Sequence, residues 1–331
     1  MKKWLYSTLL SVSLIMITGC GDGQEEQSSE EDTATENGES ENNESAEETE
    51  FPVEITDATG ETLTIEEEPE RIVSTVPSNT EIAFALGLEE EIVGVTDFAN
   101  YPEEATEKES VGGMDFNVET LLSMEPDLVL ADASSLQQAE SGLEQVEEAG
   151  IDVLVVNNAT SFEDAYDSME MIGQASGKTE EAASIVSNMK EDMEEMQEQA
   201  QDIPEEEQKK VWMEVQGSPE LYTTGQGTFV HEMLETINAE NAAAAEEGWV
   251  KYSEEEAVAL NPDVIITTYG DYSESDPAEE IKARSGWTNV PAVENNEIYD
   301  VNNDTVSRPG PRLVEGVRNL AELVYPDVFA E

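Results

Sequence analysis

Residues 179–200 read TEEAASIVSNMKEDMEEMQEQA, and the rest of the chain is organised around this stretch. Its apolar residues lie three or four positions apart, so they form one stripe on a helix. They are Ala182, Ile185, Val186, Met189, Met193, Met196 and Ala200. Thr179 is the expected N-cap, and Pro204 follows the end. At about 1.5 Å per residue the helix spans about 33 Å, the width of a small domain. It is either an amphipathic surface helix or a rigid connector between two lobes.

The composition is strongly acidic. The 331 residues include 78 Asp and Glu but only 14 Lys and Arg, which gives a formal net charge of −64. This balance argues against nucleic-acid binding, which needs basic patches to displace counterions. Such an acid excess on an otherwise ordinary globular pattern indicates adaptation to high salt, which screens the self-repulsion.

Cysteine and histidine each occur once, as Cys20 and His231. An internal disulfide is therefore impossible, and zinc sites built from several His or Cys are excluded. His231 lies in FVHEMLETI, which lacks the second His of a zincin motif. We therefore expect neither catalysis by His231 nor a resident metal or cofactor.

The amino end has the plan of a signal peptide. MKKWLYSTLLSVSLIMITGC contains two lysines, an apolar run from Trp4 to Ile17 and then small residues. The run is shorter than the roughly 20 residues that a membrane span needs. We assign residues 1–19 to the signal peptide. Residues 20–50 follow as an acidic tether, which we expect to be disordered because it cannot bury a core.

From Phe51 onward, strand-like and helix-like segments alternate, which predicts an α/β fold with mostly parallel sheets. The alternation occupies residues 51–177 and begins again in residues 204–331, on either side of a connecting segment at 178–203. LLSMEPDLVLA at 121–131 recurs as AVALNPDVIIT at 257–267, and both read as helix, Pro-Asp, strand. This repeat favours two lobes of similar build and the connector interpretation of the long helix.

The segment IGQASGKT (172–179) is similar to a phosphate-binding P-loop. A P-loop has four residues between its glycines and follows a strand. Here three residues separate Gly173 from Gly177, and a helix precedes them. We interpret the segment as a junction between two helices.

Several stretches together resemble the substrate-binding lipoproteins of ABC importers, in the cobalamin and iron–siderophore class. They are RIVSTVPSNTEIAFALGL, EIVGVTDFANYPEEA, VGGMDFNVETLLSMEPDLVLA, NPDVIITTYG and RPGPRLVEGVRNLAELVYP, together with the long helix. The resemblance covers residues 51–331 and is greatest to the BtuF-type cobalamin-binding proteins. It implies a class III periplasmic-binding-protein fold: two α/β lobes, each with a mostly parallel sheet flanked by helices, joined by one long rigid helix. It also implies that Ile17-Thr18-Gly19-Cys20 is a lipobox, cut before Cys20, which is then lipidated.

The resemblance further implies a ligand site in the cleft and a docking site on each lobe. Glu119 and Glu235 match acidic residues that dock onto arginines of the permease. Met114 and Phe116 stand where the BtuF-type proteins have Trp, and Asp132 also replaces a cleft Trp. The predicted ligand-binding residues are Phe98, Met114, Phe116, Trp249, Tyr269, Asp304, Thr305 and Arg308.

These features predict a non-enzymatic protein, exported and held by lipid at the outer face of the cell membrane. It would capture cobalamin and deliver it to a permease dimer with its ATPase subunits. An anionic siderophore usually needs several cleft cations, and Arg308 is the one plausible cation in the second-lobe loop. An iron–siderophore or haem ligand remains the alternative within the class.

Two other classes of function are open. One is a secreted α/β hydrolase or metal enzyme, against which the single His, the missing G-x-S-x-G elbow and the missing ligand cluster count. The other is a purely structural surface protein, which does not account for the family motifs.

Overall fold

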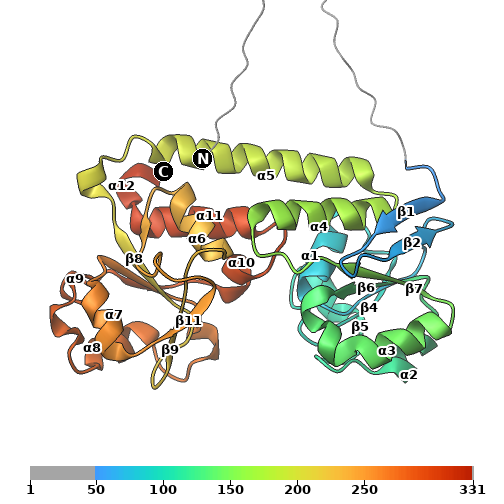
Figure 1. Cartoon of the computed structure of the whole chain (residues 1–331), viewed down its shortest axis with the longest axis horizontal. Helices are drawn as coiled ribbons and strands as arrows, with labels where there is room; N and C mark the ends of the chain where they lie inside the picture. Colours follow the sequence, from blue (N-terminus) through green and yellow to red (C-terminus); the bar gives the residue numbers. More distant parts are fainter. Residues whose placement is uncertain (1–48, 330–331) are drawn as a thin grey trace, which may run out of the picture. The chain divides into compact units, whose positions relative to one another are not determined.

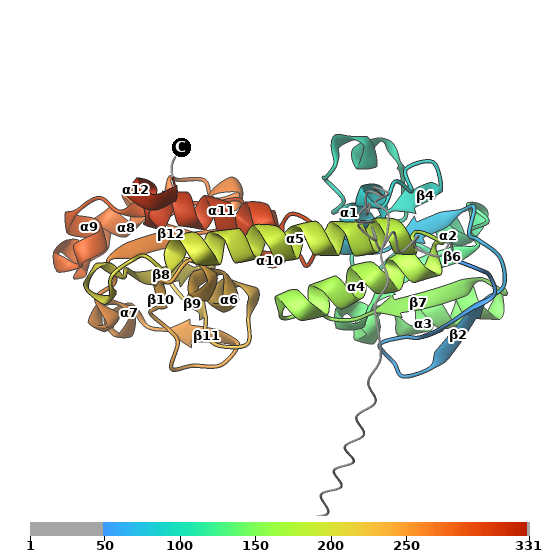
Figure 2. The ribbon, with the colours of Figure 1, turned by 90° about the horizontal axis from the view of Figure 1, so that it is seen from above.

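The computed structural model describes residues 49–329. The predicted signal peptide, Cys20 and nearly all of the predicted tether lie outside this range. The long helix α5 (Thr179–Ala200) separates two groups of strands and helices along the chain (Figures 1 and 2). We call the described residues before α5 the first lobe and those after it the second lobe. None of the helices within residues 49–329 combines the length and the apolar character that a membrane span requires.

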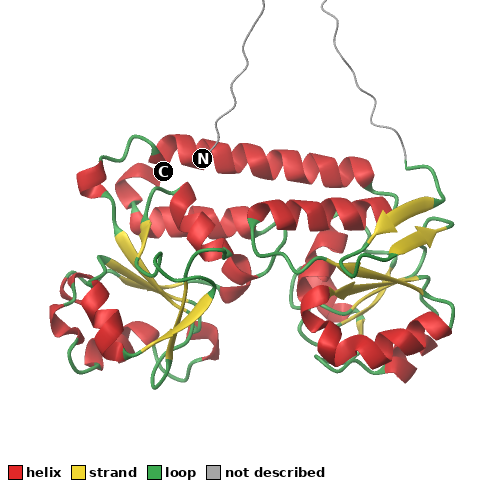
Figure 3. Cartoon of the chain, in the orientation of Figure 1, coloured by secondary structure: helices red, strands yellow, loops and turns green. Residues whose placement is uncertain are grey.

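The first lobe is built on a five-stranded, all-parallel sheet in the order β5–β4–β3–β6–β7. An antiparallel hairpin of β1 and β2 precedes it. Helices pack around the sheet (Figure 3), and β6 is buried at all five residues, as in a sheet covered on both faces. The strands are β1 (Val53–Thr56), β2 (Thr62–Ile65), β3 (Ile72–Ser74), β4 (Ile92–Val95), β5 (Glu109–Ser110), β6 (Leu128–Asp132) and β7 (Asp152–Val156). The helices are α1 (Pro77–Ala85), η1 (Glu103–Glu107), α2 (Val118–Ser123), η2 (Ala133–Ser135), α3 (Leu136–Glu148) and α4 (Phe162–Ala175).

The second lobe is built on a four-stranded, all-parallel sheet in the order β10–β8–β12–β13. A separate antiparallel pair is formed by β9 and β11. The strands are β8 (Lys210–Glu214), β9 (Leu221–Thr224), β10 (Glu240–Asn241), β11 (Trp249–Tyr252), β12 (Val264–Thr267) and β13 (Ile298–Asp300). The helices are η3 (Glu205–Glu207), α6 (Phe229–Thr236), α7 (Glu254–Leu260), η4 (Gly270–Tyr272), α8 (Pro277–Ala283), η5 (Trp287–Asn289), α9 (Pro291–Glu294), α10 (Asn303–Ser307), α11 (Leu313–Val324) and α12 (Pro326–Phe329).

Apart from the additional edge strand β5 of the first lobe, the two sheets share one topology. In each, the strand that comes first along the chain, β3 or β8, is central; the next strand, β4 or β10, lies on one side. The two later strands, β6 and β7 or β12 and β13, lie on the other side. The repeated helix–Pro-Asp–strand sequence forms α2 and β6 in the first lobe and α7 and β12 in the second. The prediction of two α/β lobes of similar build is therefore confirmed.

The apolar stripe of α5 packs against both lobes. Six of its seven predicted members are buried, and Ile185 is partly buried. One hydrophobic cluster contains Ile72 of the first lobe, Met193 of α5 and Leu320 of α11. The helix contacts α4 in the first lobe and α6 and α11 in the second. It is therefore a connector with a shared core rather than a helix on the surface of one lobe.

The start of α5 differs from the prediction. Thr179 is the first helical residue and not the cap; Lys178 holds the N-cap position without a side-chain cap hydrogen bond. The hydroxyl of Thr179 instead hydrogen-bonds that of Thr49 at 2.7 Å, which no local pattern could indicate. The junction before it is helix–turn–helix, as predicted. Gly173 lies in α4 where an added Cβ would stand 2.5 Å from the Cβ of Ala182, so this glycine permits close packing of two helices.

Candidate functional site

Loops from both lobes line one pocket of about 460 Å³. Those of the first lobe come after the carboxyl ends of β3, β6 and β7, which is where parallel α/β sheets usually bind ligands. Those of the second lobe include the start of α6, β11 and the end of α10. The lining residues are Val76, Pro77, Ser78, Asp132, Ser134, Asn158, Ala159, Thr160, Gly227, Thr228, Phe229, Val230, Trp249, Val306, Ser307, Arg308 and Pro309.

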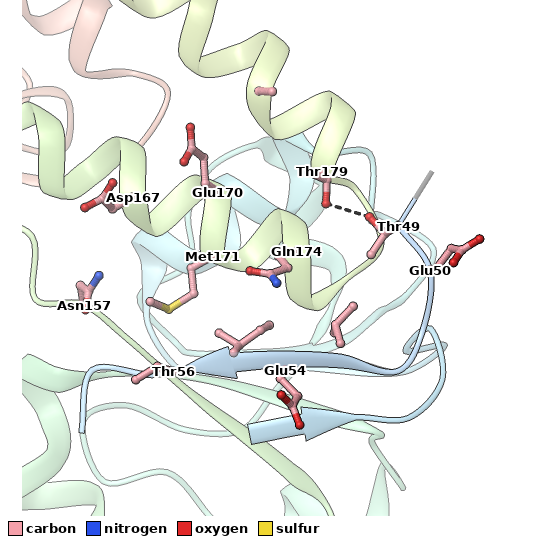
Figure 4. Close-up of a pocket in the computed structure, with 13 residues that line it drawn as sticks. Thr49, Glu50, Glu54, Thr56, Asn157, Asp167, Glu170, Met171, Gln174 and Thr179 are labelled. Atoms are coloured by element: carbon pink, nitrogen blue, oxygen red, sulfur yellow. Dashed lines mark hydrogen bonds between the residues drawn. The ribbon is translucent and has the colours of Figure 1, made fainter. Parts of the chain in front are cut away.

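A larger cavity of about 1270 Å³ lies elsewhere, between β1 and the helices α4 and α5 (Figure 4). Four carboxylates line it, those of Glu50, Glu54, Asp167 and Glu170. It begins at Thr49, the first described residue, and none of the predicted ligand-binding residues lines it. The 460 Å³ pocket is therefore our candidate site.

Three predicted ligand-binding residues are large apolar side chains that remain exposed. The exposed fraction is 52% for Phe98, 67% for Met114 and 62% for Trp249. Trp249 lines the pocket, and the Phe98 ring lies against Gly113, where an added Cβ would stand 3.4 Å from it. Phe98 and Met114 do not line the pocket, so Trp249 is the one of the three that the pocket presents.

Two other predicted aromatic residues, Phe116 and Tyr269, make their contacts within a single lobe. Phe116 packs against Gly142 of α3, where an added Cβ would stand 2.8 Å from the ring, and it borders the smaller core cluster of the first lobe. The hydroxyl of Tyr269 donates to Glu214 Oε1 at 2.6 Å. Neither residue lines the 460 Å³ pocket.

Tyr269 belongs to a buried polar group in the second lobe. Glu214 accepts two hydrogen bonds from the guanidinium of Arg284, at 2.8 and 2.7 Å, and one from Trp212 Nε1 at 3.2 Å. Burial, followed by the charge of Glu214, raises the pKa of Tyr269. Burial is the largest single effect on the pKa of Arg284 and would lower it, but the hydrogen bond to Glu214, the charge of Glu214 and the hydrogen bond to Glu280 together outweigh burial and raise the pKa. The group therefore holds Tyr269 neutral and fixed.

Arg308 is held by partners from both lobes. Its Nη1 donates to Glu81 Oε1 at 2.8 Å and to Asn100 Oδ1 at 2.6 Å, both in the first lobe. Its Nη2 lies 3.0 Å from Asp304 Oδ1 within the second lobe. Asp304 in turn accepts from Asn100 Nδ2 at 2.9 Å. Arg308 is thus both a pocket residue and a link between the lobes.

Arg312 completes this group. Its Nε and Nη2 both donate to Glu81, at 2.8 and 2.7 Å, and its guanidinium lies 4.1 Å from the centre of the Tyr101 ring. We call Glu81, Asp304, Arg308 and Arg312 the junction cluster. Two of its members are positive and two negative, so its formal charge is zero. Sequence reasoning missed Glu81; the one available signal is that it is the single charged residue of the short helix PSNTEIAFA in a very acidic chain.

The remaining predicted residues are placed as follows. Thr305 is buried, and its hydroxyl donates to the carbonyl of Asn302 at 3.0 Å. Asp132 is buried at the pocket wall, where loss of solvation raises its pKa against the hydrogen bonds that it accepts from Ser134. Glu119 is exposed in the first turn of α2, and Glu235 is exposed on α6, 3.5 Å from His231 Nε2. Within residues 49–329 no group of three or more His, Cys, Asp or Glu is arranged to hold a metal ion.

This arrangement of two lobes around a pocket agrees with a family comparison. The model of the periplasmic binding proteins matches residues 72–305, most of the described range. The chain belongs to this family. The family resemblance found in the sequence is therefore confirmed. The protein is a substrate-binding protein of an ABC importer and not an enzyme.

Individual relatives agree on the class but differ in ligand. The protein is 44% identical to the uncharacterized ABC transporter substrate-binding lipoprotein YvrC of Bacillus subtilis, over 100% of both chains. It is 27% identical to a cobalamin-binding protein of Halobacterium salinarum, over 83% of this chain and 74% of that protein. A crystal structure of a possible iron-binding, periplasmic solute-binding protein of Staphylococcus epidermidis matches with a TM-score of 0.71 and 36% identity, covering 78% of this chain and 100% of that one.

Proposed function

We propose that this periplasmic binding protein captures cobalamin in the 460 Å³ pocket and delivers it to an ABC permease. One observation carries the proposal: the exposed Trp249 lines the pocket, while the pocket cation, Arg308, is already paired with Glu81 and Asp304. A corrin ring is large and partly apolar, and a site for it needs aromatic surfaces with a few polar groups at the rim. Trp249 offers such a surface in the pocket; Phe98 and Met114 are also exposed but do not line the pocket.

The charges at the pocket favour an uncharged ligand. Among the residues that line it in the described chain, Arg308 is the one Arg or Lys. Its guanidinium is paired with Glu81 and Asp304, so it offers no net positive charge to a carboxylate or catecholate. Cyanocobalamin is neutral overall and needs no cationic cage.

An iron complex is the second candidate. The observation in its favour is the 36% identity to the possible iron-binding protein of Staphylococcus epidermidis, whose whole chain is matched. An anionic iron chelate would have to displace Glu81 or Asp304 from Arg308.

The ligand proposal is tested by tryptophan fluorescence and calorimetry on the protein without residues 1–19. Trp212 and Trp287 are fully buried, whereas Trp249 is 62% exposed at the pocket. Cyanocobalamin should quench the emission and bind with a Kd of about 1 μM or tighter, near 8 kcal/mol. Trp249→Ala should weaken binding at least about tenfold, because it removes the stacking surface.

Tyr272→Ala is the matched control, since Tyr272 is 73% exposed but lies outside the pocket. It should leave affinity unchanged. A protein that gives no heat with cyanocobalamin but clear heat with a ferric siderophore has the second function instead. An equal loss of affinity for cyanocobalamin in Trp249→Ala and Tyr272→Ala would show that Trp249 is not a specific part of the site.

Delivery is the second half of the proposal. We assign Glu119 and Glu235 to contacts with the permease, because both are exposed and one lies in each lobe. Lipid attached to Cys20 would hold the protein at the outer face of the membrane, which the lipoprotein name of the 44% identical relative supports.

A further inference from the structure

Glu81 occupies an unusual place for an acid. It lies on α1, and its side chain is 2% exposed. Burying a carboxylate is costly unless it is paired and hydrogen-bonded, and this one is both. It accepts from Arg308 Nη1 and from two nitrogens of Arg312, at 2.7 to 2.8 Å. It therefore pairs with two guanidinium groups at once and balances one of their two positive charges.

The two arginines would form an anion site without Glu81. Their side chains are 16% and 14% exposed, and Arg308 lines the pocket. Within the junction cluster Asp304 alone would remain to balance them, which leaves the cluster with one net positive charge; the charge of Glu315 also acts on Arg312, as the smallest of its electrostatic effects. Guanidinium groups bind carboxylate and phosphate through paired hydrogen bonds, and partial burial strengthens such contacts.

We infer that Glu81 is a specificity-determining residue, which keeps the binding site selective for uncharged ligands by occupying Arg308 and Arg312. The inference rests on the proposed function in one respect, that the pocket lined by Arg308 is the ligand site. Glu81 does not line the pocket and acts through Arg308. The class of ligand that it excludes is the anionic metal chelate.

Local charge decides this selectivity more than total charge does. The net charge of −64 repels every anion at long range, but screening limits this repulsion to about 8 Å at physiological ionic strength. Arg308 and Arg312 are within hydrogen-bond distance of Glu81, well inside that range.

The test compares ferric citrate, an anionic chelate, with cyanocobalamin by calorimetry. Glu81→Gln keeps the shape and removes the charge. It should bind ferric citrate at least about tenfold more tightly than the unaltered protein, and this gain should shrink between 0.1 and 1 M KCl. Glu81→Asp keeps the carboxylate and should retain the original selectivity. Glu140→Gln removes one exposed acid from α3 and should change neither affinity.

Two further variants separate charge from structural damage. Asp304→Asn should produce the same gain, because it also leaves the junction cluster with one net positive charge. The double variant Glu81→Gln/Arg308→Gln returns the formal charge of the junction cluster to zero. It should therefore bind ferric citrate no more tightly than the unaltered protein. Circular dichroism checks that each variant is folded. If Glu81→Gln does not fold, Asp304→Asn takes its place in the comparison.

The outcomes separate the two proposals. Folded Glu81→Gln and Asp304→Asn variants that bind ferric citrate no better than the unaltered protein overturn the inference. An equal gain from Glu140→Gln also overturns it, because total charge would then be the cause. Failure of the unaltered protein to bind cyanocobalamin refutes the ligand proposal alone, since the gain for ferric citrate is measured independently.

Discussion

The carboxylate of Asp263 accepts the backbone N–H of Lys210 at 3.0 Å, just as that of Asp127 accepts the N–H of Arg71 at 2.9 Å. In each lobe the same Asp also donates its own N–H to the carbonyl of that partner, at 2.8 Å. The Pro-Asp of the repeated sequence thus fixes a helix end to the start of the central strand. Two short matching sequences form the same clamp in two lobes.

Removal of the Asp263 clamp should cost stability. Asp263→Ala leaves the N–H of Lys210 without its acceptor, so we expect a loss of about 1 kcal/mol in the free energy of unfolding. Asp127→Ala should cost at least as much, because Asp127 also accepts from Glu70 N at 2.9 Å. Urea unfolding at constant high salt measures both. Asp202→Ala, at an exposed Asp after α5, is the control, and an equal loss there would refute a specific role for the clamp.

Charge reversal at the two proposed docking residues should separate transport from binding. The double variant Glu119→Lys/Glu235→Lys should abolish uptake in cells, because lysines would repel the arginines expected on the permease. Its affinity for the ligand should be unchanged. Glu140→Lys/Glu255→Lys reverses one exposed helical acid in each lobe and should transport normally. Normal uptake by the first variant would rule out the assignment.

Salt should stabilise the protein strongly. Self-repulsion from a net charge of −64 opposes folding in dilute buffer, and KCl screens it. We expect the Tm to rise by about 10 °C or more between 0.02 and 1 M KCl. Sucrose at matched osmolality controls for general exclusion effects. Equal Tm values in both KCl solutions would contradict adaptation to high salt.

Alkaline pH should weaken the fold through Tyr166. Burial, followed by the charges of Glu163 and Glu232, raises the pKa of Tyr166 from 10.0 to about 12. Because the raised pKa belongs to the folded state, this stability is complete below pH 10 and is lost as the pH rises to 12. The loss is at most about 1.4 kcal/mol per pH unit.

Unfolding measured across this window in Tyr166→Phe should show a smaller alkaline loss than in the unaltered protein. Tyr272→Phe, at a 73% exposed side chain, should follow the unaltered protein. Identical pH profiles for all three proteins would show that Tyr166 does not titrate in this window.

Local patterns predicted most of the fold. The carboxyl end of α5 at Ala200 was predicted to the residue because an uninterrupted apolar stripe ends before Pro204. The Thr179 cap was wrong because its hydroxyl had a partner 130 residues away, which local rules do not include.

The site was less predictable because its decisive contacts join distant residues. Arg308 and Glu81 are 227 residues apart in the chain, and Arg312 and Glu81 are 231 apart. Sequence pattern identified Arg308 as a cation in the pocket but not the acid that neutralises it. Family resemblance selected Trp249 for the pocket, yet it could not show that the Tyr269 hydroxyl is committed to Glu214.

The methionines of α5 restrict how such a protein can evolve. Met189, Met193 and Met196 belong to one apolar cluster that includes side chains from both lobes. A recombination event that exchanged one lobe for that of a relative would therefore have to match this helix face as well as the pocket. A chain cut after Ala200 would expose the same thioethers to water and to oxidants. Because both lobes pack against the same helix, we expect them to be inherited together.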